Sequence, residues 1–212
     1  MSTSPDVPTA VVFDLGGVLI RWDPRHLYRR LMPPDEVEAF LDEVGFAAWN
    51  HGQDAGGGWA EAVEAHGRRF PHRRELLAAY PARFPETLAG PIEGSVEILR
   101  ELHRRGRTRM LALTNWSAEL FPHAESAFEF LQLFEGILVS GVERVAKPDQ
   151  AVFQLLLERY GLDPAATVFI DDSPANVEAA AGAGLQALVF TDPETLRRDL
   201  RRLGLLAGAG SG

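Results

Sequence analysis

Four separate positions of the sequence carry side chains that together could transfer a phosphoryl group. Asp14 offers a carboxylate that can attack phosphorus, and with Asp172 it offers the oxygen ligands that Mg²⁺ prefers. Thr114 offers a hydroxyl beside backbone N–H groups, and Lys147, the chain's only lysine, offers a compact positive charge. Phosphoryl transfer to a carboxylate requires a nucleophile, a cation and fixed donors for the phosphoryl oxygens. These residues therefore indicate phosphoryl-transfer chemistry if the fold brings them together.

The elements that must position these residues alternate between strands and helices. Short apolar runs at 9–14, 109–114, 167–170 and 185–190, with a weaker run at 136–140, predict buried parallel strands. Helical patterns with suitable ends occur at 93–105, 149–160, 174–183 and 191–203. The alternation predicts an α/β fold with a doubly wound, mostly parallel sheet of the Rossmann-like kind. Ligands bind beyond the carboxyl ends of such strands, where the chain places Asp14, Thr114, Asn115, Asp171 and Asp172.

The region 21–91 interrupts this alternation. It predicts short helices at about 27–31, 34–44, 58–67 and 73–82, separated by prolines and glycines. Because the region follows the first strand directly, we expect a small helical cap above the strand ends. The predicted organisation is a catalytic core of residues 1–20 and 92–212 with a helical cap of residues 21–91. Residues from 204 onward, rich in glycine and alanine, predict a frayed tail.

Composition excludes several classes of partner. The net charge of −9 argues against a nucleic-acid partner, which normally calls for a basic face. No apolar run reaches the roughly 18 residues of a membrane span, and the first residues lack the pattern of a secretory signal. The chain has no cysteine, so disulfides are excluded and a cytoplasmic location is expected. The expected partner is a small-molecule phosphate ester, and the chain is expected to be a monomer or a homodimer.

Four segments in order along the chain carry a family resemblance. They are FDLGGVL at 13–19, LTN at 113–115, AKP at 146–148 and IDDSPAN at 170–176. Their order and spacing resemble the four motifs of the haloacid dehalogenase-like hydrolase superfamily, and the insertion resembles the helical C1-type cap of that superfamily. The chain is most similar to the subgroup that includes the phosphatase domain of soluble epoxide hydrolase and bacterial sugar-phosphate phosphatases.

The resemblance implies a Mg²⁺-dependent phosphatase that hydrolyses a small phosphate monoester. Asp14 would form an aspartyl-phosphate, and the carbonyl of Gly16 with the carboxylate of Asp172 would complete the protein ligands of Mg²⁺. Thr114 and Lys147 would bind the transferring phosphoryl group.

The resemblance also implies roles for residues around this centre. Asn115 would contribute near the phosphoryl group, Asp171 would orient Lys147 or a metal-bound water, and Asn176 would lie behind them. Trp116 follows Thr114 and Asn115 directly, so it is expected near the substrate. The stretch 49–54 of the cap is a further candidate for substrate contact.

One position departs from the phosphatase pattern. Phosphatases of the superfamily usually carry a second aspartate two residues after the nucleophile, where it acts as general acid and base. The chain has Gly16 there, so it lacks a contribution that is typically about 10²–10⁴-fold in rate. Asp23, His26 and His51 are candidates for a replacement acid.

Two alternatives remain at this point. A 2-haloacid dehalogenase would use the same nucleophile without metal, although that subgroup typically has an aromatic residue where Gly16 stands. A phosphate-binding pseudoenzyme would explain the missing acid, but it would have no need of Asp14, Lys147 and Asp172 together.

Overall fold

The computed structural model describes residues 7–207 and contains the expected parallel sheet. Five strands run in the order β5-β4-β1-β6-β7, with β1 (Ala10–Phe13) at the centre. Its neighbours are β4 (Arg109–Thr114) and β6 (Thr167–Asp171), and the outer strands are β5 (Gly136–Val139) and β7 (Gln186–Val189). Every pairing is parallel. The prediction of an α/β fold with a parallel sheet is therefore confirmed.

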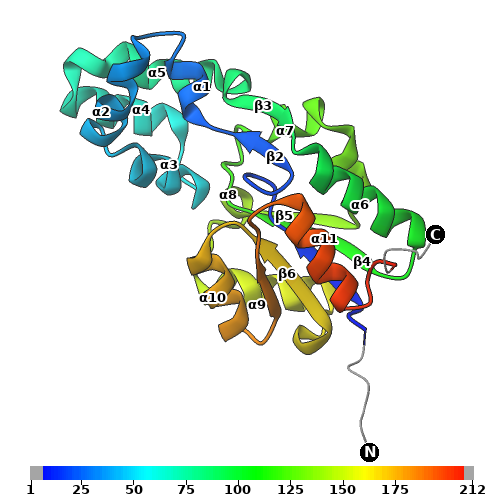
Figure 1. Ribbon diagram of the computed structural model, residues 1–212. Helices are drawn as coiled ribbons and strands as arrows, with labels where there is room; N and C mark the ends of the chain where they lie inside the picture. The colour runs from blue at the N-terminus through cyan, green and yellow to red at the C-terminus, as the bar shows by residue number, and fades with distance from the viewer. Residues whose placement is uncertain (1–6, 208–212) are drawn as a thin grey trace, which may run out of the picture.

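Helices cover both faces of this sheet (Figure 1). Alternate residues of β1 face opposite sides, so that Val11 and Phe13 belong to one apolar cluster while Ala10 and Val12 belong to the other. The first cluster includes buried residues of α6 (Glu93–Arg105) and α11 (Pro193–Arg202). The second includes buried residues of α9 (Gln150–Tyr160) and α10 (Pro174–Gly182). Smaller elements complete the core, namely α7 (Phe121–Ala127), η4 (Glu129–Leu133), α8 (Ser140–Glu143) and η5 (Pro164–Ala166).

The inserted region forms a group of short helices at one end of the molecule, at the upper left of Figure 1. They are α1 (Pro24–Tyr28), η1 (Pro34–Glu36), α2 (Val37–Glu43), α3 (Phe46–Asp54), α4 (Trp59–Arg69), η2 (Pro71–Arg73), α5 (Arg74–Ala82) and η3 (Phe84–Thr87). An antiparallel pair of strands, β2 (Ile20–Trp22) and β3 (Leu88–Pro91), joins this group to the core. The predicted limits of the cap, 21 and 91, fall within these two strands.

Three details of the sequence prediction are wrong. The helix expected at 27–31 begins earlier, at Pro24, because the Asp23 side chain accepts a hydrogen bond from the Arg25 N–H and caps the helix. Helix α3 was not predicted, since its second half is mostly polar and shows no clear apolar stripe. The tail does not fray at 204, because Leu205 and Leu206 are buried and the Leu205 N–H donates to the Leu200 carbonyl at 2.9 Å. The remainder of that predicted tail, 208–212, lies outside the described residues.

None of the helices within residues 7–207 is both long and apolar enough to cross a bilayer.

Candidate active site

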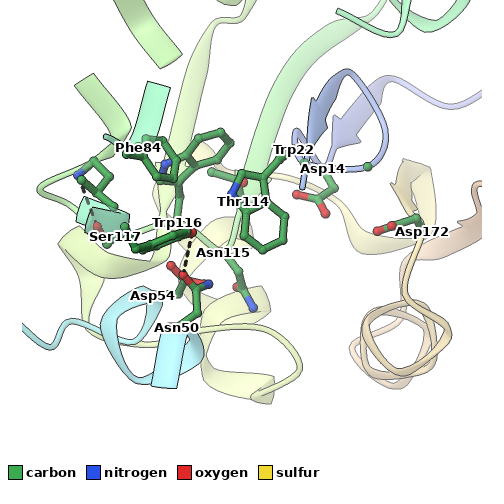
Figure 2. Close-up of a pocket in the computed structure, with 14 residues that line it drawn as sticks. Asp14, Trp22, Asn50, Asp54, Phe84, Thr114, Asn115, Trp116, Ser117 and Asp172 are labelled. Carbon is green, nitrogen blue, oxygen red and sulfur yellow. Dashed lines mark hydrogen bonds between the residues drawn. The ribbon is translucent and has the colours of Figure 1, made fainter. Parts of the chain in front are cut away.

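A cavity of about 330 Å³ lies where the carboxyl ends of the strands meet the cap. The core supplies its floor through residues that follow β1, β4 and β6, and the cap supplies the opposite wall (Figure 2). The lining residues are Asp14, Gly16, Gly17, Trp22, Asn50, Asp54, Tyr80, Phe84, Thr114, Asn115, Trp116, Ser117, Leu120 and Asp172. A partly enclosed cavity with a few convergent polar groups is the usual form of a small-molecule site.

A buried ion pair lies beneath the floor of this cavity. The Lys147 ammonium lies 3.0 Å from Asp14 Oδ1 and 2.6 Å from Asp171 Oδ2, and it also donates to the Leu113 carbonyl at 2.9 Å. The Leu15 N–H donates to the same Asp14 oxygen at 2.7 Å. Within residues 7–207, Asp14 Oδ2 accepts no hydrogen bond. The chain therefore orients the Asp14 carboxylate through one oxygen and leaves the other for a ligand.

Burial shifts the pKa values of Asp14 and Lys147. It raises the pKa of Asp14 to about 7, although the Lys147 charge opposes the shift. Burial alone would lower the pKa of Lys147, but the charges of Asp14 and Asp171 outweigh it and hold that pKa above its usual value. The lysine is thus a permanent cation, while Asp14 without a metal ion titrates near neutral pH.

Asn115 fixes the loop that carries the lysine. Its side-chain NH₂ donates to the Lys147 carbonyl at 2.8 Å, and its side-chain oxygen accepts the Lys147 N–H at 2.9 Å. This two-way pairing holds the loop against the end of β4. The Asn115 side chain is therefore engaged with backbone, although the residue also lines the cavity. A direct contact between Asn115 and substrate stays a prediction.

Three carboxylates come close enough to share a cation. One oxygen each of Asp14, Asp171 and Asp172 lies within 4.8 Å of the others. The oxygens of Asp171 are already engaged with Lys147, with the Ser173 N–H at 2.8 Å and with the Asn176 amide at 3.0 and 3.1 Å. Asp171 is also fully buried, whereas Asp172 is exposed. Asp14 and Asp172 are therefore the carboxylates that are free to hold a metal ion.

The structure brings together most of the predicted site residues. Asp14, Gly16, Thr114, Asn115, Trp116 and Asp172 line the cavity, and Lys147, Asp171 and Asn176 lie behind them. The stretch 49–54 contributes Asn50 and Asp54 to the lining. The sequence prediction selected Trp116 and not Trp22 among the tryptophans, and it did not include Tyr80 or Phe84, because aromatic residues in a helical insertion are explained equally well as part of its core.

None of the three candidate acids lines the cavity. Asp23 caps α1 and pairs with Arg25, His26 lies 3.4 Å from the Thr87 carbonyl through Nδ1, and His51 is exposed. The structure therefore places none of these three candidates at the cavity, since each side chain is directed to a local contact or to solvent.

Comparison with known proteins identifies the family. Residues 8–184 match the model of the haloacid dehalogenase-like hydrolases. The chain belongs to this family. A phosphoglycolate phosphatase of Rhodospirillum rubrum is 31% identical over 95% of the chain and 86% of its own length. The sesquiterpene phosphatase astK of Aspergillus oryzae is 26% identical over 92% of the chain and 95% of its own length.

Solved structures of this hydrolase family share the fold. The HAD family enzyme bt-2542 of Bacteroides thetaiotaomicron, in complex with magnesium and inorganic phosphate, superimposes with a TM-score of 0.66. It is 23% identical over 87% of this chain and 95% of its own. An L-2-haloacid dehalogenase of Xanthobacter autotrophicus with covalently bound chloropropionic acid gives a TM-score of 0.63 at 19% identity, over 92% and 83% of the two chains. The shared fold thus spans both phosphate-binding and dehalogenase members.

Proposed function

We propose that this protein is a Mg²⁺-dependent phosphatase that hydrolyses small phosphate monoesters through an aspartyl-phosphate on Asp14. The main support is the site itself, in which Asp14 faces a cavity with the Lys147 ammonium at 3.0 Å and the Asp172 carboxylate within 4.8 Å. The relatives named phosphatases add to this support. A dehalogenase that works without a metal ion would not require the exposed Asp172 carboxylate as a metal ligand beside Asp14.

The donor set fits a magnesium ion. Asp14 and Asp172 offer carboxylate oxygens, and Gly16, which also lines the cavity, could offer its backbone carbonyl as a third ligand. When bound, Mg²⁺ would neutralise charge on the phosphoryl oxygens and on the two carboxylates. The buried Lys147 ammonium, 3.0 Å from Asp14 Oδ1, adds a second positive charge to the site.

Each of the other site residues has its own role in the proposed phosphoryl transfer. Asp14, held by Leu15 and Lys147 through Oδ1, attacks phosphorus as the bond from phosphorus to the ester oxygen breaks. The departing oxygen takes its proton from water, since Gly16 has no side chain to supply one. The Thr114 hydroxyl and the Lys147 ammonium stabilise the phosphoryl oxygens during this step. Asp171 and Asn115 keep the lysine in place. Water then hydrolyses the aspartyl-phosphate and regenerates Asp14.

Phosphate release from a set of monoesters, measured with Mg²⁺ and with excess EDTA, tests the proposed activity. We expect release that depends on Mg²⁺. Halide release from 2-chloropropionate, with no phosphate released under any condition, would establish the dehalogenase instead. Tight phosphate binding without turnover would establish the pseudoenzyme.

A methyl group at Gly17 is expected to disable the metal site. A Cβ there would lie 2.3 Å from Asp172 Oδ2, and Gly17 has a φ of 78°, so Gly17→Ala must displace the Asp172 carboxylate. We expect kcat/KM to fall by about 10²-fold or more, the effect of a misplacement of about 1 Å, and the Mg²⁺ concentration for half-maximal activity to rise.

Gly106→Ala is the matched control, because Gly106 also has a positive φ, of 59°, does not line the cavity, and a Cβ there meets no atom within 4 Å. Its loss of activity is expected to stay within about threefold, as for a substitution that causes no clash. Equal losses for both variants would contradict the proposed role of Asp172.

Mg²⁺ affinity is expected to fall as the pH falls below 7. Burial raises the pKa of Asp14 to about 7, so this carboxyl is neutral below that pH and must lose its proton before it can bind the ion. The affinity should therefore drop by about tenfold for each pH unit below 7 and level off above it. Calorimetric titration at pH 6 and pH 8 measures this difference, and repetition in buffers of different ionisation enthalpy measures the proton release. Equal affinities with no proton release would contradict the assignment of Asp14 as a ligand.

A further inference from the structure

The cavity has a second polar end that the proposed chemistry at Asp14 does not use. Asp54 and Asn50 line it from α3, and Figure 2 shows them apart from Asp14 and Asp172. Asn50 Nδ2 donates to Asp54 Oδ2 at 2.7 Å. The Tyr80 hydroxyl in turn donates to Asn50 Oδ1 at 3.0 Å. This chain of hydrogen bonds fixes how the cap presents the Asp54 carboxylate.

The core also holds Asp54 in place. The Ser140 hydroxyl, at the carboxyl end of β5, donates to the Asp54 carbonyl at 2.5 Å. The same hydroxyl accepts the Trp116 N–H at 3.0 Å. The end of α3 is therefore tied to the strand ends that form the cavity floor.

Asp54 is a buried carboxylate without a counter-ion. Its exposed fraction is 9%, and it forms no ion pair within residues 7–207. Burial of a carboxylate is costly unless a charge or a set of donors compensates it, and Asn50 supplies only part of that compensation. A group from the substrate can supply the rest, since the carboxylate lines the cavity.

The remaining lining residues define which groups fit. Among the lining residues that the structure describes there are three aspartates and no arginine, lysine or histidine. Lys147 lies buried behind Asp14 and serves only the phosphoryl end. The walls near Asp54 are largely aromatic, formed by Trp22, Tyr80, Phe84 and Trp116. A second anionic group on the substrate would therefore meet a like charge in a weakly solvated space.

On the premise that the proposed phosphatase activity holds, we propose that Asp54, oriented by Asn50, selects the leaving group of the substrate. It accepts a hydrogen bond from a hydroxyl or ammonium group, and it excludes leaving groups that carry a carboxylate or a second phosphate. Burial raises the pKa of Asp54 to about 7, against the opposing effects of the Ser117 N–H and the Lys147 charge. A donor on the ligand offsets this cost of burial, which is consistent with the proposed role.

Three phosphate esters test this selection in wild type and in Asp54→Asn. Ethanolamine phosphate and phosphoserine differ by one carboxylate, and p-nitrophenyl phosphate has a good leaving group without a donor. We expect wild type to favour ethanolamine phosphate over phosphoserine by about tenfold or more in kcat/KM, because the added carboxylate of phosphoserine is repelled by the Asp54 charge. In Asp54→Asn this ratio should shrink by about the same factor, mainly through KM, while p-nitrophenyl phosphate turnover changes by less than about twofold.

Glycerol phosphate separates the two kinds of donor. An asparagine at position 54 still accepts a hydrogen bond from a hydroxyl, but it no longer attracts an ammonium. A loss for ethanolamine phosphate with glycerol phosphate retained therefore supports selection through the charge of Asp54. Equal losses for the two esters would contradict it, because the asparagine still accepts a hydrogen bond from the hydroxyl.

Glu119→Gln is the control for cap docking. Glu119 accepts the Trp59 N–H at 2.9 Å and does not line the cavity, so the variant should change all substrates by the same factor. If Asp54→Asn lowers kcat/KM equally for ethanolamine phosphate and phosphoserine, Asp54 acts as a proton donor. That result would overturn the proposal that Asp54 selects the leaving group. Wild type that prefers phosphoserine would overturn it while leaving the phosphatase intact. Failure of wild type to hydrolyse even p-nitrophenyl phosphate would refute the proposed function itself.

Discussion

Asp14→Asn is expected to reduce phosphate release by about 10⁴-fold or more, because an amide cannot form the covalent intermediate. The variant should remain folded, since Lys147 keeps its 2.6 Å contact with Asp171 and its hydrogen bond to Leu113. Burial raises the pKa of Asp14 to about 7, well above that of an unfolded aspartate. A raised folded pKa means that the ionised carboxylate costs stability as the pH rises through 7. Metal-free Asp14→Asn should therefore melt at the same or a higher temperature than wild type at pH 8.

Asp163→Asn is the matched control for this experiment. Asp163 accepts the Ala165 N–H at 3.0 Å far from the cavity, and asparagine preserves such a cap. This variant should keep full activity. If Asp14→Asn retains more than about 1% of wild-type turnover, a loss that the removal of one catalytic proton transfer alone could cause, then Asp14 is not the nucleophile.

Gly16→Asp is expected to make the enzyme faster on unactivated esters. The chain lacks the second aspartate of the usual phosphatase pattern, and a Cβ at Gly16 meets no atom within 4 Å, so the side chain has room. A correctly placed general acid contributes about 10²–10⁴-fold. We expect kcat on alkyl phosphates to rise by about 10²-fold, with much less change on p-nitrophenyl phosphate, whose leaving group needs no proton.

Gly16→Asn separates proton transfer from other effects of the new side chain. Asparagine has nearly the same size as aspartate but cannot donate a carboxylic proton. Its rate on alkyl phosphates should stay at or below the wild-type rate. Equal rates for the two variants would show that the missing acid does not limit this enzyme.

Local sequence patterns predicted the centre of the fold well. The strand β1 is fully apolar and β4 and β6 have apolar centres, and such runs have few alternatives to burial in a parallel sheet. Since the carboxyl ends of neighbouring parallel strands share one edge, Asp14, Thr114 and Asp172 had to gather there once the topology was known.

The structure of the cap was less predictable, because several of its helices and strands are held in place by contacts with residues distant in the sequence. Helix α3 has little apolar periodicity, yet the contacts of Asn50 with Tyr80 and of Asp54 with Ser140 hold it in place. The strand pair β2–β3 joins segments about seventy residues apart and contains Gly90 and Pro91, which give no strand signal. These long-range pairings place Trp22 in the cavity, and no local pattern could indicate them.

The pairing of Asn115 with Lys147 shows the same limit within the core. The sequence indicated that both residues belong to the site, but a two-way hydrogen bond between a side chain and a backbone segment 32 residues away is visible only in three dimensions. This pairing gives Asn115 a role in positioning the Lys147 segment. Such a role explains its place in the site as well as the predicted contact with the phosphoryl group does.

Chemical trapping of the intermediate tests the central claim most directly. Wild-type protein is mixed with a ³²P-labelled monoester and Mg²⁺, quenched in acid within milliseconds, and digested for peptide mapping. We predict label on the peptide that contains Asp14, released by hydroxylamine as expected for an acyl phosphate, and no label in Asp14→Asn. Phosphate release by wild type without any labelled intermediate, or label on a residue other than Asp14, would contradict the proposed mechanism.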